Sequence, residues 1–280
     1  MTEESPTPRQ EKFRDLGTRL VTGVIAVAVI TYGIFWAPVW LFSLGTGVWI
    51  ACGLFEFFTM LKRKGVLVYR VFGIVIGAVI PTVVHFQLGS NRSGEVLFIV
   101  LACFGLFILQ FSRRDRPYAL EGVALTFFGI MYISWFLSFI IKIRYMPSGS
   151  IYLAYLLAVT KSGDIAAYVL GTFLGRHTLI PHISPRKTME GTLGGILASC
   201  LVSLAFAGVF PGSPSLAQLA FLGFLFGVAG LCGDLAESLI KRYAQAKDSG
   251  TLLPGLGGVL DAMDSVLFTA PLFYYYLQTW

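Results

Sequence analysis

The chain has 280 residues, of which 56% are hydrophobic and 13% charged, and its mean hydropathy is +0.75. This composition excludes an ordinary soluble domain and indicates an integral membrane protein. The formal net charge is +6, but the basic residues are dispersed among short polar segments without a groove-reading motif, so nucleic-acid binding is disfavoured.

Apolar runs long enough to cross a hydrocarbon core of roughly 30 Å as helices recur along the sequence. The polar segment 1–16 precedes them, and no small-residue cleavage site follows the first run, so we expect that helix to be retained. We predict an all-α, polytopic integral membrane protein with about nine transmembrane helices, at residues 17–36, 38–61, 69–88, 95–111, 119–142, 150–174, 190–210, 215–239 and 262–279.

Lysine and arginine gather in alternate polar segments. Short loops rich in these residues stay on the cytoplasmic side of a membrane. With nine spans and a cytoplasmic N-terminus, 17 of the 21 lysines and arginines fall on the inside. We therefore predict a multi-pass protein of the cell inner (plasma) membrane, whose basic loops also contact anionic headgroups.

The two halves of the chain differ in character. After the polar segment 1–16, residues 17–148 are expected to form a scaffold of about five transmembrane helices, whose inside loops hold cations and little else. Residues 149–280 are expected to form a second transmembrane domain of about four helices. This domain contains acidic residues at or beside membrane depth: Asp164 near Lys161, Asp234 with Glu237, and Asp261 with Asp264.

These carboxylates point to a functional site, because a lipid-facing carboxylate costs several kcal/mol and normally faces a wet interior with partners. The predicted topology brings three helices to one membrane face, and an i, i+3 spacing puts two carboxylates on one helix face. We expect a cluster of acidic oxygens open to the cytosol. Oxygen ligands without histidine or cysteine suit Mg²⁺, Mn²⁺ or Ca²⁺.

Phosphate is the natural companion of such a cluster. The inside loops "SPRKTMEGTLGG" (184–195) and "SLIKRYAQAKDSGTLLPGLGG" (238–258) mix lysine and arginine with serine, threonine and glycine, which supply charge, hydroxyl donors and close backbone approach to an anion. No Walker sequence occurs, so a P-loop is excluded. The alternative is local: Asp261 and Asp264 favour a helix N-terminus, and Ser184 or Thr188 is a cap.

The string "SLIKRYAQAKDSGTLLPGLGGVLDAMDS" (238–265) resembles the signature of the phosphatidate cytidylyltransferases, or CDP-diacylglycerol synthases. The pattern is approximately S-x-x-K-R-x4-K-D-x-G-x4-G-H-G-G-x-x-D-R-x-D-S. This chain matches it at Ser238, Lys241, Arg242, Lys247, Asp248, Gly250, Gly255, Gly257, Gly258, Asp261, Asp264 and Ser265.

Two further strings are similar to segments of the same family. They are "GDIAAYVLGTFLGRH" (163–177), which matches at Asp164, Ala167, Tyr168, Gly171, Gly175 and Arg176, and "SPRKTMEGTLGG", which matches at Ser184, Pro185, Lys187, Thr188, Glu190 and Gly191. The resemblance covers roughly residues 150–280. Leu256 replaces the family's histidine and Ala262 its arginine, which bears on substrate affinity, rate or specificity more than on the class of reaction.

The resemblance implies that phosphatidic acid attacks the α-phosphorus of CTP at the cytoplasmic face, giving CDP-diacylglycerol and pyrophosphate. It implies Mg²⁺ or Mn²⁺, with room for a second metal ion, and a homodimer. The implied metal ligands are Asp234, Asp261 and Asp264, with Asp164 as a further member. The implied phosphate-binding residues are Lys187, Lys241, Arg242 and Lys247, helped by Ser184, Thr188 and Ser238; Asp248 and Glu190 orient these cations or contact cytosine or ribose.

Two alternatives stay open at this point. One is a related CTP-dependent nucleotidyltransferase or kinase that uses an isoprenoid lipid. The other is an ion-coupled transporter with Asp164, Lys161 and Asp234 as relay groups, although the sequence shows no pair of similar halves of the kind transporters often have.

Overall fold

The computed structural model describes residues 8–87, 93–112, 119–255 and 257–279. The all-α membrane fold predicted from composition is confirmed. The helices are α1 (Pro8–Phe35), α2 (Val39–Arg63), α3 (Arg70–Gln87), α4 (Ser93–Phe111), α5 (Ala119–Gly129), the π-helical segment η1 (Ile130–Trp135), α6 (Phe136–Tyr145), α7 (Gly149–Leu174), α8 (Met189–Ala205), α9 (Leu216–Tyr243) and α10 (Val259–Thr279). The strands are β1 (Thr178–Ile180) and β2 (Ser184–Thr188).

Five helices in the described part of the chain are long and apolar enough to cross a membrane: Val39–Arg63, Gly94–Phe111, Leu120–Tyr145, Gly149–Leu174 and Leu216–Tyr243. The third of these runs through α5, η1 and α6 without a break. Val21–Phe35, Arg70–Phe86 and Met189–Ala205 are shorter apolar helices. The count of nine spans therefore stays a prediction, although helices occupy each of the nine predicted ranges.

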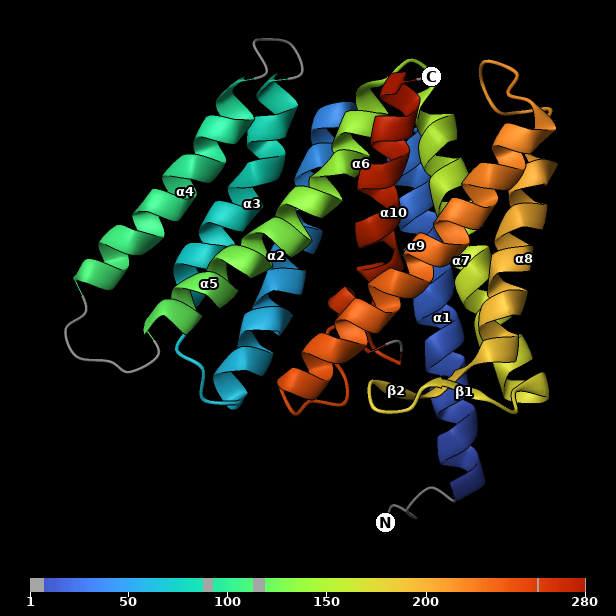
Figure 1. The fold of residues 1–280 in the computed structure, drawn as a ribbon, viewed down its shortest axis with the longest axis horizontal. Helices are drawn as coiled ribbons and strands as arrows, with labels where there is room; N and C mark the ends of the chain where they lie inside the picture. Colours follow the sequence, from blue (N-terminus) through green and yellow to red (C-terminus); the bar gives the residue numbers. More distant parts are fainter. Residues whose placement is uncertain (1–7, 88–92, 113–118, 256, 280) are drawn as a thin grey trace, which may run out of the picture.

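Successive helices run in opposite directions through the bundle, with α5, η1 and α6 counted as one continuous helix (Figure 1). The turns at 64–69, 175–188 and 244–255 lie at the same end as the start of α1, and those at 36–38, 146–148 and 206–215 lie at the other end with the last turn of α10. The first set contains the basic loops of the second half. One end of the bundle thus holds the polar segments that the sequence singles out.

The small sheet at this end is a feature that the hydropathy pattern does not predict. Strands β1 and β2 pair antiparallel, with Thr178 opposite Thr188 and Ile180 opposite Ser184. Thr188 then caps α8, because its Oγ1 accepts a hydrogen bond from the backbone N–H of Gly191 at 3.1 Å. The hairpin therefore fixes Lys187 directly before the first turn of α8.

Helices α7 and α8 approach each other closely through small residues, as membrane helices commonly do. A Cβ atom on Gly195 would lie 2.8 Å from the carbonyl oxygen of Gly163 and 2.9 Å from the Cβ of Ala167. Farther from the hairpin, Tyr155 of α7 stacks edge-on with Phe226 of α9 and packs against Phe273 of α10. This core holds α7, α9 and α10 together in the part of the bundle farther from the polar end.

Candidate functional site

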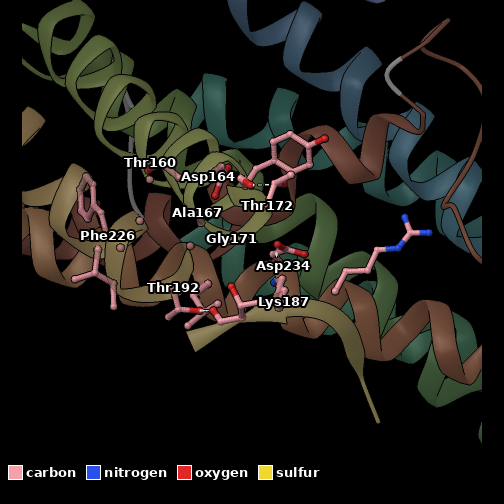
Figure 2. A pocket seen from close by; sticks show the side chains of 18 residues that line it. Thr160, Asp164, Ala167, Gly171, Thr172, Lys187, Thr192, Phe226 and Asp234 are labelled. Carbon is pink, nitrogen blue, oxygen red and sulfur yellow. Dashed lines mark hydrogen bonds and ion pairs between the residues drawn. The ribbon is translucent and has the colours of Figure 1, made fainter. Parts of the chain in front are cut away.

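A cavity of about 580 Å³ lies between α7, α8, α9 and β2 (Figure 2). It begins near the hairpin, where Arg186, Lys187 and Asp234 line it, and reaches Thr160, Ile196 and Phe226 deeper in the bundle. Figure 2 shows Lys187 close to Asp234, with Phe226 on the opposite side of the cavity. The cavity is therefore charged at the polar end of the bundle and apolar within it.

The charged end of the cavity contains an ion pair. Lys187 Nζ lies 2.5 Å from Asp234 Oδ2, and the lysine side chain is 18% exposed whereas the aspartate is 39% exposed. The ion pair joins β2 to α9 across the cavity. Asp164 also lines this cavity from α7, so two of the four predicted metal ligands face the same space.

Asp234 is also one of a compact group of three carboxylates, called the acidic group below. Asp234 and Glu237 of α9 and Asp264 of α10 each offer an oxygen, and these oxygens lie within 4.8 Å of one another. Asp264 is 7% exposed and Glu237 1% exposed. Asp234 belongs to both the cavity and this acidic group, so the two features form one site.

The donor set of the acidic group fits a hard divalent cation, because it consists of carboxylate oxygens without histidine or cysteine. It overlaps with the predicted ligand set at Asp234 and Asp264. Glu237 takes part in this group, although the sequence argument left it out of the ligand set. Its signal was visible as the i, i+3 partner of Asp234.

Asp164 is held by its own partners on the cavity wall. Lys161 Nζ donates hydrogen bonds to Asp164 Oδ2 at 2.9 Å and to Ser265 Oγ at 2.8 Å, and Ser265 Oγ donates to Asp164 Oδ2 at 2.7 Å. Ser265 follows Asp264 in α10. The triangle of Lys161, Asp164 and Ser265 therefore ties α7 to α10 beside the acidic group.

Asp261 is paired with a cation. Lys241 Nζ donates to Asp261 Oδ1 at 2.8 Å and to Glu237 Oε2 at 2.6 Å. The other oxygen, Asp261 Oδ2, accepts from the backbone N–H groups of Gly258 at 2.9 Å and Ser249 at 3.3 Å. Asp261 thus connects the loop before α10 to the end of α9. It is linked to the acidic group through Lys241, which also binds Glu237.

The remaining predicted phosphate-binding residues lie around this end of the bundle. Arg242 Nε donates to the carbonyl oxygen of Ile183 at 3.1 Å, which joins the end of α9 to the hairpin. Lys247 and Asp248 are exposed in the loop before α10, whereas Ser184 and Ser238 are half-buried. Ala262 is half-buried in the first turn of α10, and Leu256 lies outside the described residues.

Glu190 binds backbone groups next to the hairpin. Its Oε2 accepts from the N–H groups of Arg176 at 3.1 Å and His177 at 3.3 Å, and its Oε1 lies 2.6 Å from His177 Nδ1. Glu190 therefore orders the chain between α7 and β1. The two cations that line the cavity among the described residues, Arg186 and Lys187, belong to β2 of the same hairpin.

Comparison with known proteins places most of the chain in one group. The model of the cytidylyltransferase family matches residues 17–280. A phosphatidate cytidylyltransferase of Bacillus subtilis is 31% identical over 94% of this chain and 98% of its own length. One of Synechocystis sp. is 29% identical over 92% of this chain and 95% of its own.

A third relative is similar to part of the chain only. It is the uncharacterized protein YnbB of Escherichia coli, which is 40% identical over 56% of this chain. That alignment spans about half of YnbB, 52% of its length. The two longer alignments show that the similarity extends into the N-terminal scaffold, where the sequence strings gave no resemblance.

Proposed function

We propose that this chain, which belongs to the cytidylyltransferase family, is a CTP:phosphatidate cytidylyltransferase. In this reaction an oxygen of the phosphatidic acid phosphate bonds to the α-phosphorus of CTP. The bond from the α-phosphorus to the oxygen that bridges to the β-phosphorus breaks, and pyrophosphate leaves. The products are CDP-diacylglycerol and pyrophosphate, and no protein nucleophile is needed.

The observation that carries the proposal is the shared position of Asp234. It lies 2.5 Å from Lys187 at the charged end of the cavity and belongs to the acidic group with Glu237 and Asp264. Two anionic reactants can meet only where cations offset their charge. A cavity with lysine on one wall and a metal-type carboxylate group behind it meets this requirement.

The residues of the chain have distinct roles in the proposed reaction. Lys187 and Arg186 bind phosphate oxygens at the mouth of the cavity, where they face both substrates. Lys241, already bound to Glu237 and Asp261, keeps positive charge between α9 and α10. Asp234, Glu237 and Asp264 would hold a divalent cation, which supplies charge neutralisation and orientation of the phosphates when bound.

The shape and chemistry of the cavity support a lipid as one substrate. Its deeper wall contains Ile196, Phe226 and Leu231, and the outer faces of α7 and α8 are apolar: Tyr168 is 76% exposed and Leu193 62% exposed. A substrate with two acyl chains can lie against these faces with its phosphate at the charged end. CTP arrives from the aqueous side, which we propose is the cytoplasm.

One assay tests the proposal. The full chain is purified in detergent, incubated with labelled CTP, phosphatidic acid and Mg²⁺, and scored for lipid-soluble label. Label transfer that depends on phosphatidic acid supports the proposal. Transfer to a polyprenyl phosphate in place of phosphatidic acid would instead identify an isoprenoid-lipid enzyme, and no transfer with Mg²⁺ or Mn²⁺ to either acceptor would reject both.

A further inference from the structure

Glu56 is a buried carboxylate in the scaffold half of the chain. It lies in α2 between Phe55 and Phe57 and is 3% exposed. A carboxylate in an apolar helix is costly unless it has hydrogen-bond partners. The partners of Glu56 therefore indicate why it is present.

Those partners belong to the segment that leads into α10. Glu56 Oε2 accepts a hydrogen bond from the backbone N–H of Leu260 at 2.9 Å and one from Ser249 Oγ at 3.3 Å. Its Oε1 is buried and has no hydrogen-bond partner among the described residues. The carboxylate thus joins the scaffold to the first turn of α10, where free N–H groups and the helix dipole favour a negative charge.

Glycines allow this approach. A Cβ atom on Gly258 would lie 2.6 Å from Glu56 Oε2, and one on Gly250 would overlap with the Glu56 carboxylate. The sequence argument expected the glycines of this loop to let the backbone approach a bound anion. At Gly250 and Gly258 the anion that the backbone approaches is Glu56 itself.

The contacts continue from Ser249 to Asp261. The backbone N–H of Asp261 donates to Ser249 Oγ at 3.3 Å, and the backbone N–H of Ser249 donates to Asp261 Oδ2 at 3.3 Å. Asp261 in turn binds Lys241. A chain of hydrogen bonds therefore runs from Glu56 through Ser249 to the charged end of α9.

We propose that Glu56 is a positioning residue for the transfer reaction: it fixes Ser249, Gly250 and Gly258 of the loop before α10 and, through Ser249, the Asp261–Lys241 pair in the geometry that binds CTP. The proposal rests on the proposed function. Glu56 touches no substrate in this arrangement. Its contribution is to make the loop a preformed surface, so that CTP binding does not have to order it.

The test uses Glu56→Leu, which keeps most of the volume and removes both acceptor oxygens, and Glu56→Gln, which keeps one acceptor. We expect Glu56→Leu to raise the KM for CTP about tenfold, in line with the loss of one strong hydrogen-bond acceptor at a buried site. Glu56→Gln should restore most of the affinity, with a KM within about threefold of the unmodified chain.

Glu95→Leu is the matched control. Glu95 is a half-buried scaffold carboxylate with a 17% exposed side chain. It accepts from Trp135 Nε1 at 2.5 Å and Lys142 Nζ at 2.8 Å, and neither partner belongs to the described loop before α10. Its loss should lower stability and the number of active molecules while the KM for CTP stays unchanged. If Glu56→Leu behaves in the same way, Glu56 has only a structural role and the proposal is overturned.

Two further measurements keep the test decisive. Ser249→Ala removes the link between Glu56 and Asp261, so it should raise the KM for CTP even if Glu56→Leu does not fold; an unchanged KM would contradict the proposal. Hydrogen exchange at the backbone amides of residues 258–261 should be faster in Glu56→Leu but not in Glu95→Leu. Hydrogen exchange is measured without turnover, so it tests whether Glu56 holds these residues even if the unmodified chain transfers no label. Absence of label transfer would reject the proposed function separately.

Discussion

Lys187 Nζ lies 2.5 Å from Asp234 Oδ2, and this ion pair joins the hairpin to α9. The two residues are the point where the cavity meets the acidic group. A cation from β2 and a carboxylate from α9 are therefore paired at this point. The contribution of each side chain to the transfer reaction can be measured by replacing one at a time.

Asp234→Asn is expected to lower kcat/KM for CTP by about 100-fold or more, because it removes charge from the proposed cation site and from the partner of Lys187. The amide keeps the size of the side chain, so thermal unfolding in detergent should change little. Glu95→Gln, a neutralised carboxylate remote from the cavity, is the control. Transfer by Asp234→Asn at the rate of that control would remove Asp234 from the mechanism.

Lys187→Met is expected to reduce transfer by about 10- to 100-fold, because it takes a cation from the place where two anionic phosphates meet. Lys187→Arg should retain a larger share of activity, since it keeps the charge while changing its shape. Initial rates at varied CTP and varied phosphatidic acid will measure both variants. Equal losses in the two variants would show that the charge of Lys187 is not what the reaction needs.

Removal of divalent cations with a chelator should abolish label transfer, and added Mg²⁺ or Mn²⁺ should restore it. Asp264→Asn should then raise the half-activating Mg²⁺ concentration by about tenfold or more, because it removes a charged oxygen from the acidic group. The titration is run with Glu95→Gln in parallel. Full activity in the presence of excess chelator would exclude a cation at this site.

Gly195→Ala is expected to destabilise the protein by about 1 to 3 kcal/mol, because overpacking forces α7 and α8 apart. The added Cβ would lie 2.8 Å from the Gly163 carbonyl oxygen. Gly45→Ala is the matched control in another helix, since nothing lies within 4 Å of the Cβ it would add. Thermal unfolding of both variants in the same detergent compares them, and equal midpoints would show that α7 and α8 can separate without cost.

Single cysteines will report on the sidedness of the two ends of the bundle. Lys247→Cys and Ser213→Cys are introduced separately into a chain whose four native cysteines are replaced. We expect a membrane-impermeant maleimide to label Lys247→Cys only in inside-out vesicles and Ser213→Cys only in right-side-out vesicles. The reverse pattern would place the site on the other face of the membrane.

Several features of this protein could be predicted because they depend on local sequence. Long apolar runs predicted helices in all nine ranges, since hydropathy follows from composition within each segment. The family was predicted from three short strings in the second half, and the comparison over residues 17–280 confirms it. The sequence also predicted that Asp234 and Asp264 would come together, because both belong to polar helix ends on the same predicted face.

Other parts of the site depend on contacts between distant segments. Glu56 contacts Ser249 and Leu260, which lie 193 and 204 residues away. Its only signal in the sequence was a charge inside an apolar run. Whether Asp261 faces a metal site or a lysine was equally undetermined, because helical spacing places it on the face of Asp264 without fixing the rotation and depth of α9.

Sequence by itself determined that the chain is a helical membrane protein with most of its charges gathered in a few polar segments. Apolar runs of this length satisfy their backbone hydrogen bonds in lipid as helices, and charged side chains are costly there. The tertiary structure alone decided how those charges divide: Asp234, Glu237 and Asp264 form the acidic group, while Lys241 binds Asp261 and Glu56 supports the loop. The physical reason is that these carboxylates lie at nearly the same depth in the bundle. Differences of a few ångströms therefore decide which groups each one contacts, and helix packing sets those distances.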